Sequence, residues 1–191
     1  YRVHFANHQE LLEGQLAMAG PLAFSLKEWI EEHRHLLKPP VGNQVVWENT
    51  DTIVMIVGGP NKRKDFHINQ TEEFFHQLEG DMVLRVKENG EYRNIDIREG
   101  DVMLLPPGIP HSPQRGENTV GMVVERKRSA GMEDQFVVFC DECDEQVFHS
   151  QFHLQDIVRQ LKPLMENFWS SEKNRTCSSC GAVVQHVAMS D

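Results

Sequence analysis

The sequence predicts an all-β barrel with a few flanking helices and a small C-terminal metal knuckle built from four cysteines. Three observations predict this architecture. Residues 43–128 consist of short runs rich in Val, Ile, Leu, Met and Phe that alternate with turn residues, as in all-β domains. A capped helical pattern precedes these runs. Two Cys-x-x-Cys pairs follow them, on either side of a second helical pattern.

The 191 residues divide into three expected segments. Residues 1–20 show little periodicity and form an N-terminal extension. Residues 21–132 form the barrel, and residues 133–191 hold a helix and the cysteine knuckle. A chain of this length can bury a core without disulfides.

The first expected element is a helix over residues 26–37. Ser25, with Glu28 three residues later, matches a capping box, and the apolar stripe that follows ends before a Pro-Pro pair. His33 and His35 stand two residues apart on this helix and point in different directions, so we expect two surface histidines.

Seven strands are expected next. Asn89-Gly90 is a strong hairpin signal between two of them, because both residues tolerate positive φ. Gly80-Asp81 and Gly100-Asp101 indicate further tight turns. The strands are predicted at residues 45–48, 52–57, 74–79, 82–87, 92–97, 102–105 and 120–126. A C-terminal amphipathic helix is then expected over residues 153–167, with a kink at Pro163.

Charge and hydropathy exclude two classes of partner. The formal net charge of −10 and the lack of a long basic run argue against a nucleic-acid surface. No run of about 18 apolar residues is present to span a bilayer. All four cysteines fall in two close pairs rather than a spread disulfide framework, and no secretory signal is visible, so a reducing cytoplasm is expected.

Two segments resemble the two sequence motifs of the cupin superfamily, which folds as a jelly-roll β-barrel. Residues 65–80 read DFHINQTEEFFHQLEG, and residues 100–111 read GDVMLLPPGIPH, with the superfamily's spacing of glycine, proline and histidine. Six residues separate Glu73 from the motif glycine, Gly80, and on a strand Glu73 shares a face with Phe75 and Gln77, whereas Glu72 points the other way. Glu73 is therefore the expected ligand, and His76, on the opposite face, is not.

The motifs supply His67, Glu73 and His111 as metal ligands. Asp65 stands where many cupins carry a further histidine, which leaves a set of two histidines and one carboxylate. Such a facial triad suits a non-haem Fe(II) oxygenase. The competing interpretation is that each of the three is an ordinary loop or surface residue.

A closer resemblance is to the 3-hydroxyanthranilate 3,4-dioxygenase family. It covers residues 20–131 and continues into the paired-cysteine tail. The segments that carry it are residues 36–43, 57–61, 72–75, 104–107, 111–115 and 124–126. The resemblance implies opening of the ring of 3-hydroxyanthranilate with O2 to 2-amino-3-carboxymuconate semialdehyde, on the tryptophan (kynurenine) route to quinolinate and NAD. It also implies a homodimer.

The same resemblance assigns substrate-binding roles. Arg63 and Arg115 would bind the substrate carboxylate, Glu125 would accept a hydrogen bond or a proton from the ring hydroxyl, and Asn43 would help to close the pocket. Without the resemblance, Arg63 would be expected as a solvated residue of a basic cluster and Glu125 as a partner of Arg126.

Cys140, Cys143, Cys177 and Cys180 form the second constellation. Two Cys-x-x-Cys knuckles can present four thiolates to one ion in a closed, structural site, and Gly181 permits the positive φ that a knuckle needs. The residues alone leave Zn and Fe open, and the resemblance implies a rubredoxin-like iron site. Two disulfides or a redox pair are the alternatives.

Two other functions remain open on the sequence. One is a different cupin oxygenase or isomerase acting on a small carboxylate, because two arginines do not demand an aromatic substrate. The other is a non-enzymatic cupin that binds a small acid, which the intact triad disfavours because a pure binder needs no open metal positions.

Overall fold

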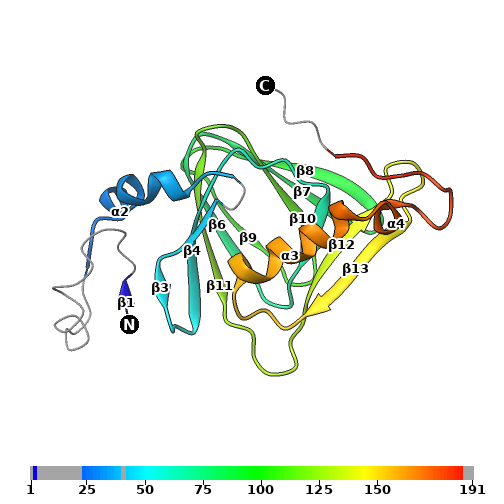
Figure 1. Cartoon of the computed structure of the whole chain (residues 1–191). Coiled ribbons are helices and arrows are strands. Elements are labelled where there is room, and N and C mark those ends of the chain that lie inside the picture. Colours follow the sequence, from blue (N-terminus) through cyan, green and yellow to red (C-terminus); the bar gives the residue numbers. More distant parts are fainter. Residues whose placement is uncertain (1, 4–22, 40–41, 187–191) are drawn as a thin grey trace.

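Two β-sheets face each other in the computed structural model, which describes residues 2–3, 23–39 and 42–186 (Figure 1). The larger sheet has the order β13-β12-β5-β10-β7-β8 and the smaller has β2-β4-β11-β6-β9. The expected jelly-roll cupin barrel is confirmed. The strands of the larger sheet are β5 (Asp65–Ile68), β7 (Met82–Glu88), β8 (Glu91–Ile97), β10 (His111–Arg115), β12 (Asp134–Phe139) and β13 (Gln146–Phe152).

The second sheet contains most of the strands expected from hydrophobic runs. Its members are β2 (Asn43–Val45), β4 (Thr52–Gly58), β6 (Glu73–Glu79), β9 (Val102–Leu105) and β11 (Val120–Arg126). One expected strand is divided: residues 45–48 separate at the fully buried Val46 into β2 and β3 (Trp47–Glu48). Strand β3 pairs instead with β1 (Arg2–Val3). The rest of the expected extension, residues 1–20, lies outside the described residues.

The barrel interior is an apolar cluster between the sheets. Alternate residues of β7 point inward, namely Met82, Leu84 and Val86, and they meet Phe75 and Met55 from the opposite sheet. The predicted hairpin is confirmed, because Asn89 and Gly90 both have positive φ, 53° and 83°.

A helix covers the outer face of the smaller sheet at one end. It is α2 (Leu26–His33), capped by Ser25 and followed by a 3-10 turn, η1 (Arg34–Leu36). Its His33 corrects the expectation of two surface histidines. His33 is buried, stacks on Trp29 with ring centroids 3.9 Å apart, and donates from Nδ1 to the Trp29 carbonyl at 2.7 Å. A spacing of four residues places both rings on the inward side of the helix. His35 is exposed, as expected.

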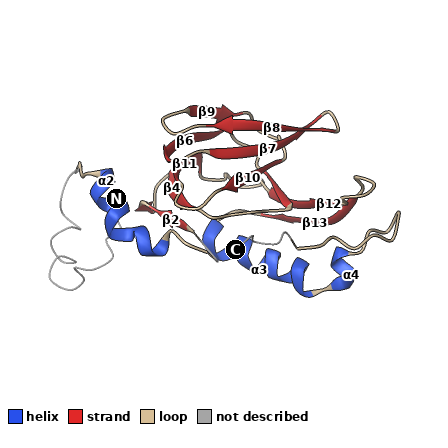
Figure 2. Cartoon of the chain, turned by 90° about the horizontal axis from the view of Figure 1, so that it is seen from above, coloured by secondary structure: helices blue, strands red, loops and turns tan. Residues whose placement is uncertain are grey.

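The C-terminal segment packs against the end of the larger sheet. Helices α3 (Ile157–Ser170) and α4 (Glu172–Arg175) run beside β12 and β13 (Figure 2). Phe136, Val138, Leu161 and Phe168 form the buried cluster between them. The larger sheet continues beyond residue 132, because β12 pairs with β5. Pro163 lies inside α3. No described helix combines the length and hydrophobicity needed to cross a bilayer.

Candidate active site

The three predicted metal ligands converge inside the barrel. Their exposed fractions are 4% for His67, 6% for Glu73 and 1% for His111. One ligand atom from each lies within 4.8 Å of the others. Two imidazoles and a carboxylate, all shielded from water, form a donor set that fits a divalent transition metal.

Strand register brings the triad together. His67 on β5 lies directly across from His111 on β10, and Glu73 at the start of β6 lies across from Leu105 and Glu125. The turns of the two motifs are joined by the Gly108 N–H, which donates to the Asn69 carbonyl at 2.8 Å. Residues about 40 positions apart in sequence therefore reach one point because partners across a sheet point to the same side.

Hydrogen bonds orient the ligands. His111 donates from Nδ1 to the Ile109 carbonyl at 2.9 Å, which leaves Nε2, 3.1 Å from Glu73 Oε2, to carry a lone pair. Asn69 donates to the same glutamate oxygen at 2.9 Å. Burial alone would raise the pKa of Glu73, but the interactions of its carboxylate with His111, His67 and the Arg128 cation together lower this pKa below its ordinary value. The carboxylate is thus held in its ionised form, which is the form that can bind a metal.

Arg63 and Arg115 are held on the same side of the barrel. A short antiparallel bridge joins Asn61 to Arg115, and the Gln114 side chain bonds both the N–H and the carbonyl of Arg63. Arg63 is not a solvated member of the basic cluster, since its side chain is 12% exposed and pairs with Asp65. The residue that replaces the usual cupin histidine thus anchors an arginine.

Arg115 is almost fully buried, and no carboxylate of the described residues forms an ion pair with it. Its Nη1 donates to Gln77 Oε1 at 2.9 Å, whereas its Nε has no hydrogen-bond partner among the described residues. Burial lowers the pKa of Arg115 to about 10. A cation buried in this way is expected to bind an anion. Gly121 leaves space for the Arg115 guanidinium, because a Cβ at residue 121 would lie 2.7 Å from Arg115 Nη1.

Glu125 faces the triad from β11. It is 2% exposed, and its Oε1 has no hydrogen-bond partner in the described part of the chain. Its other oxygen accepts from Arg128 at 2.7 Å, not from Arg126, which is exposed. Burial and the nearby charge of Glu73 raise the pKa of Glu125. Such a carboxylate can accept a proton from a bound ligand.

Strand register and alternation also place Asn43, Glu72 and His76. Asn43 on β2 pairs with Val57, a residue of the barrel interior, so it lies on the interior side of the sheet. Glu72 is exposed and His76 is only partly buried, which agrees with the strand alternation that selected Glu73.

Comparison with known proteins decides the family. Residues 18–169 match the family model described as 3-hydroxyanthranilic acid dioxygenase. The chain belongs to this family. It is 51% identical over 167 residues to a 3-hydroxyanthranilate 3,4-dioxygenase of Ruegeria pomeroyi, covering 87% of this chain and 93% of that relative. It is also 51% identical over 160 residues to one from Shewanella woodyi, covering 83% and 85%.

Solved structures give a more distant likeness. A cupin-2 domain containing protein from Shewanella frigidimarina has a TM-score of 0.38 and 23% identity, over 44% of this chain and 78% of that one.

The sequence predicted no role in the site for three buried residues of this 3-hydroxyanthranilic acid dioxygenase family member. They are Gln77, Arg128 and Asp134, with exposed fractions of 1%, 4% and 0%. Gln77 shares the strand face of Glu73 and could have been found by its period of two. Arg128 and Asp134 lie beyond the last motif and carry no local signal.

The four cysteines also gather at one point. Cys140 Sγ lies 3.6 Å from Cys180 Sγ, and Cys143 Sγ lies 3.5 Å from Cys177 Sγ. All four are free thiols, and one sulfur from each lies within 4.8 Å of the rest. Backbone N–H groups of Cys180 and Ser179 help to lower the pKa of Cys177 to about 7. The arrangement fits a tetrahedral metal site.

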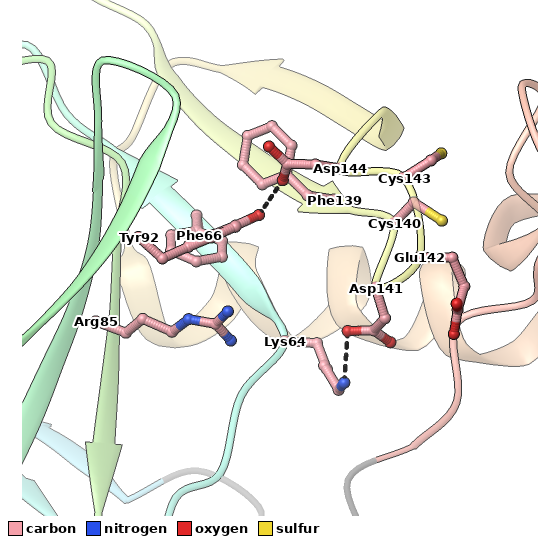
Figure 3. Close-up of a pocket in the computed structure, with 10 residues that line it drawn as sticks. All are labelled: Lys64, Phe66, Arg85, Tyr92, Phe139, Cys140, Asp141, Glu142, Cys143 and Asp144. Carbon is pink, nitrogen blue, oxygen red and sulfur yellow. Dashed lines mark hydrogen bonds and ion pairs between the residues drawn. The ribbon is translucent and has the colours of Figure 1, made fainter.

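The first knuckle is attached to the outside of the barrel. It borders a pocket of about 380 Å³, where Lys64 pairs with Asp141 at 2.7 Å and the Tyr92 hydroxyl donates to Asp144 (Figure 3). Lys87 also donates to Asp144 at 2.6 Å. Asp141 and Asp144 of the knuckle are thus paired with barrel residues, and these contacts hold the knuckle against the larger sheet.

Proposed function

We propose that this chain is an Fe(II)-dependent ring-cleaving dioxygenase that converts 3-hydroxyanthranilate and O2 to 2-amino-3-carboxymuconate semialdehyde. Family membership supports the reaction. The observation that connects this reaction with the site is a pair of buried groups, Arg115 Nε and Glu125 Oε1, beside the buried His-Glu-His set. Neither group has a hydrogen-bond partner within the described part of the chain. They match the carboxylate and the hydroxyl of this substrate.

His67, Glu73 and His111 would hold the iron. When bound there, ferrous iron supplies the redox chemistry and open positions through which O2 reacts with an aromatic ring. Both oxygen atoms of O2 enter the product, so the balance needs no external reductant. The protein contributes a dry site and fixed orientation of the substrate.

The substrate is oriented by charge at one end and by a proton acceptor at the other. Arg115 and Arg63 bind the carboxylate through planar N–H donors. Glu125 Oε1 accepts the proton of the 3-hydroxyl group, a transfer favoured because burial raises the pKa of this carboxyl group. Asn43 lines the interior side of β2 and closes the pocket.

The test is turnover by protein loaded with Fe(II) without oxygen. On adding 3-hydroxyanthranilate and air we expect one O2 consumed per ring-opened product, followed with an oxygen electrode and by absorbance. 2-Aminophenol, which lacks the carboxylate, should show a much higher KM. Arg115→Gln should remove most of this difference between the two substrates. No oxygen uptake with 3-hydroxyanthranilate would overturn the proposal.

We also propose a structural metal, iron or zinc, bound by the four cysteines. The crossed pairing of two knuckles from distant parts of the chain supports it. Free thiols in this arrangement support a reducing compartment, the cytoplasm.

A homodimer is the proposed assembly. The outer face of edge strand β9 carries Val102 and Leu104, which are 61% and 56% exposed. They adjoin Phe74 on β6, across from Leu104, in a sheet whose other end is covered by α2. An apolar face beside an open sheet edge supports pairing with a second copy.

A further inference from the structure

A buried ion-pair network stands behind the triad. Arg128 and Asp134 belong to neither cupin motif, yet both side chains are fully inaccessible to solvent. Arg128 donates from Nε to Asp134 Oδ1 and from Nη2 to Asp134 Oδ2, each at 2.6 Å. This two-pronged contact fixes the plane of the carboxylate.

Asp134 also contacts a metal ligand. Its Oδ2 accepts a hydrogen bond from His67 Nε2 at 2.7 Å. An imidazole that donates from one ring nitrogen carries its lone pair on the other, so the contact sets both the tautomer and the rotation of the ring. Strand β12 provides the position, because Asp134 is its first residue and β12 pairs with β5, which carries His67.

Arg128 links this arrangement to the proton acceptor. The same Nη2 that contacts Asp134 donates to Glu125 Oε2 at 2.7 Å, while Nη1 donates to the Arg126 carbonyl at 2.6 Å. Only a guanidinium can reach two carboxylates and a carbonyl from one fixed plane. His67 and Glu125, on different sheets, are thus joined through a single cation.

We propose that Asp134 is a positioning residue that orients His67 for the metal, and that Arg128 fixes Asp134 and Glu125 relative to each other. This inference rests on the proposed function, and it adds two residues that touch neither substrate nor metal. A purely structural ion pair would stabilise the fold without affecting the metal.

The first test is the affinity of Asp134→Asn for Fe(II), measured without oxygen by competition with a chelator. We expect binding to weaken by roughly 10–100-fold, as is usual on loss of a ligand's hydrogen-bond partner. The electron paramagnetic resonance spectrum of the nitric oxide adduct should also change. Glu133→Gln removes the adjacent, exposed carboxylate and should match the wild type. Wild-type affinity and spectrum in a folded Asp134→Asn protein would overturn the proposal.

Arg128→Lys is the second variant, and it keeps the buried positive charge if Asp134→Asn fails to fold. We expect lower Fe(II) affinity together with lower turnover per bound iron, because both Asp134 and Glu125 lose a fixed donor. Wild-type values for both would overturn the proposal. The binding measurements need no substrate, so failure of the wild type to open 3-hydroxyanthranilate would reject the proposed reaction separately.

Discussion

Gly121 determines where the Arg115 guanidinium can lie. Any β-carbon at this position would come within 2.9 Å of both Arg115 terminal nitrogens and of Gln77 Oε1. The end of an arginine side chain can move, so Gly121→Ala should leave the fold intact and displace the guanidinium. We expect KM for 3-hydroxyanthranilate to rise roughly tenfold, the equivalent of one charge-assisted hydrogen bond.

Gly116→Ala is the matched control for this prediction. It adds the same methyl group one residue after Arg115, where the nearest atom is Thr119 Cγ2 at 3.8 Å, an ordinary contact. Its KM should equal that of the wild type. Equal KM values for both variants would show that Gly121 does not control the arginine.

Asp134 predicts a pH dependence of stability. Burial opposes its ionisation, but the hydrogen bonds from Arg128 and His67 outweigh burial and lower its pKa below 3.8. A depressed carboxylate pKa stabilises the fold above the unfolded-state pKa, and this stability is lost as the pH falls through the folded-state pKa. The gap in free energy of unfolding between metal-free wild type and Asp134→Asn should therefore be about 1–3 kcal/mol at pH 7 and shrink below pH 3.8. Urea unfolding at several pH values measures it, and a constant gap would contradict it.

At the residue scale, the sequence predicts those site residues that belong to a motif of fixed spacing. His67, Glu73 and His111 follow from motif spacing, and the period of two along a strand separates Glu73 from Glu72. Arg128 and Asp134 were not predictable, because their partners come from other strands and only the folded register brings them together.

At the scale of elements, the cysteine knuckles join the β12–β13 turn to the segment after α4. Cys177→Ser should lose the bound metal and destabilise this connection while leaving iron at the triad. A loss of about 3 kcal/mol would lower Tm by roughly 6–12 °C. Calorimetry and metal analysis measure both effects.

Ser178→Ala, a change at the adjacent exposed position, is the control for the knuckle variant. It should keep both metals and the wild-type Tm. A Cys177→Ser protein with unchanged Tm but no turnover would argue against a purely structural role.

Hydrophobic alternation predicted some elements and missed others for a physical reason. Strands β9 and β11 lie within the predicted bounds, because their runs are apolar and end at turn residues. Strands β5 and β10, with sequences DFHI and HSPQR, were missed. Their inward residues are the polar groups of the site, so the usual apolar signal is absent where the site is built.

At the scale of the whole molecule, the exposed face of β9 predicts self-association. Leu104→Lys places a charge in the centre of the apolar face and should convert the proposed dimer to a monomer in sedimentation velocity experiments. Asn94→Lys, at an exposed position of β8 in the other sheet, should remain dimeric. A wild-type protein that sediments as a monomer would contradict the dimer.

The position of iron in crystals of the Fe(II)-loaded protein tests the central claim most directly. Anomalous scattering at the iron absorption edge should give a peak within bonding distance of His67, Glu73 and His111 together. An iron-loaded crystal with no peak between these three side chains would contradict the account, whatever metal the cysteines hold.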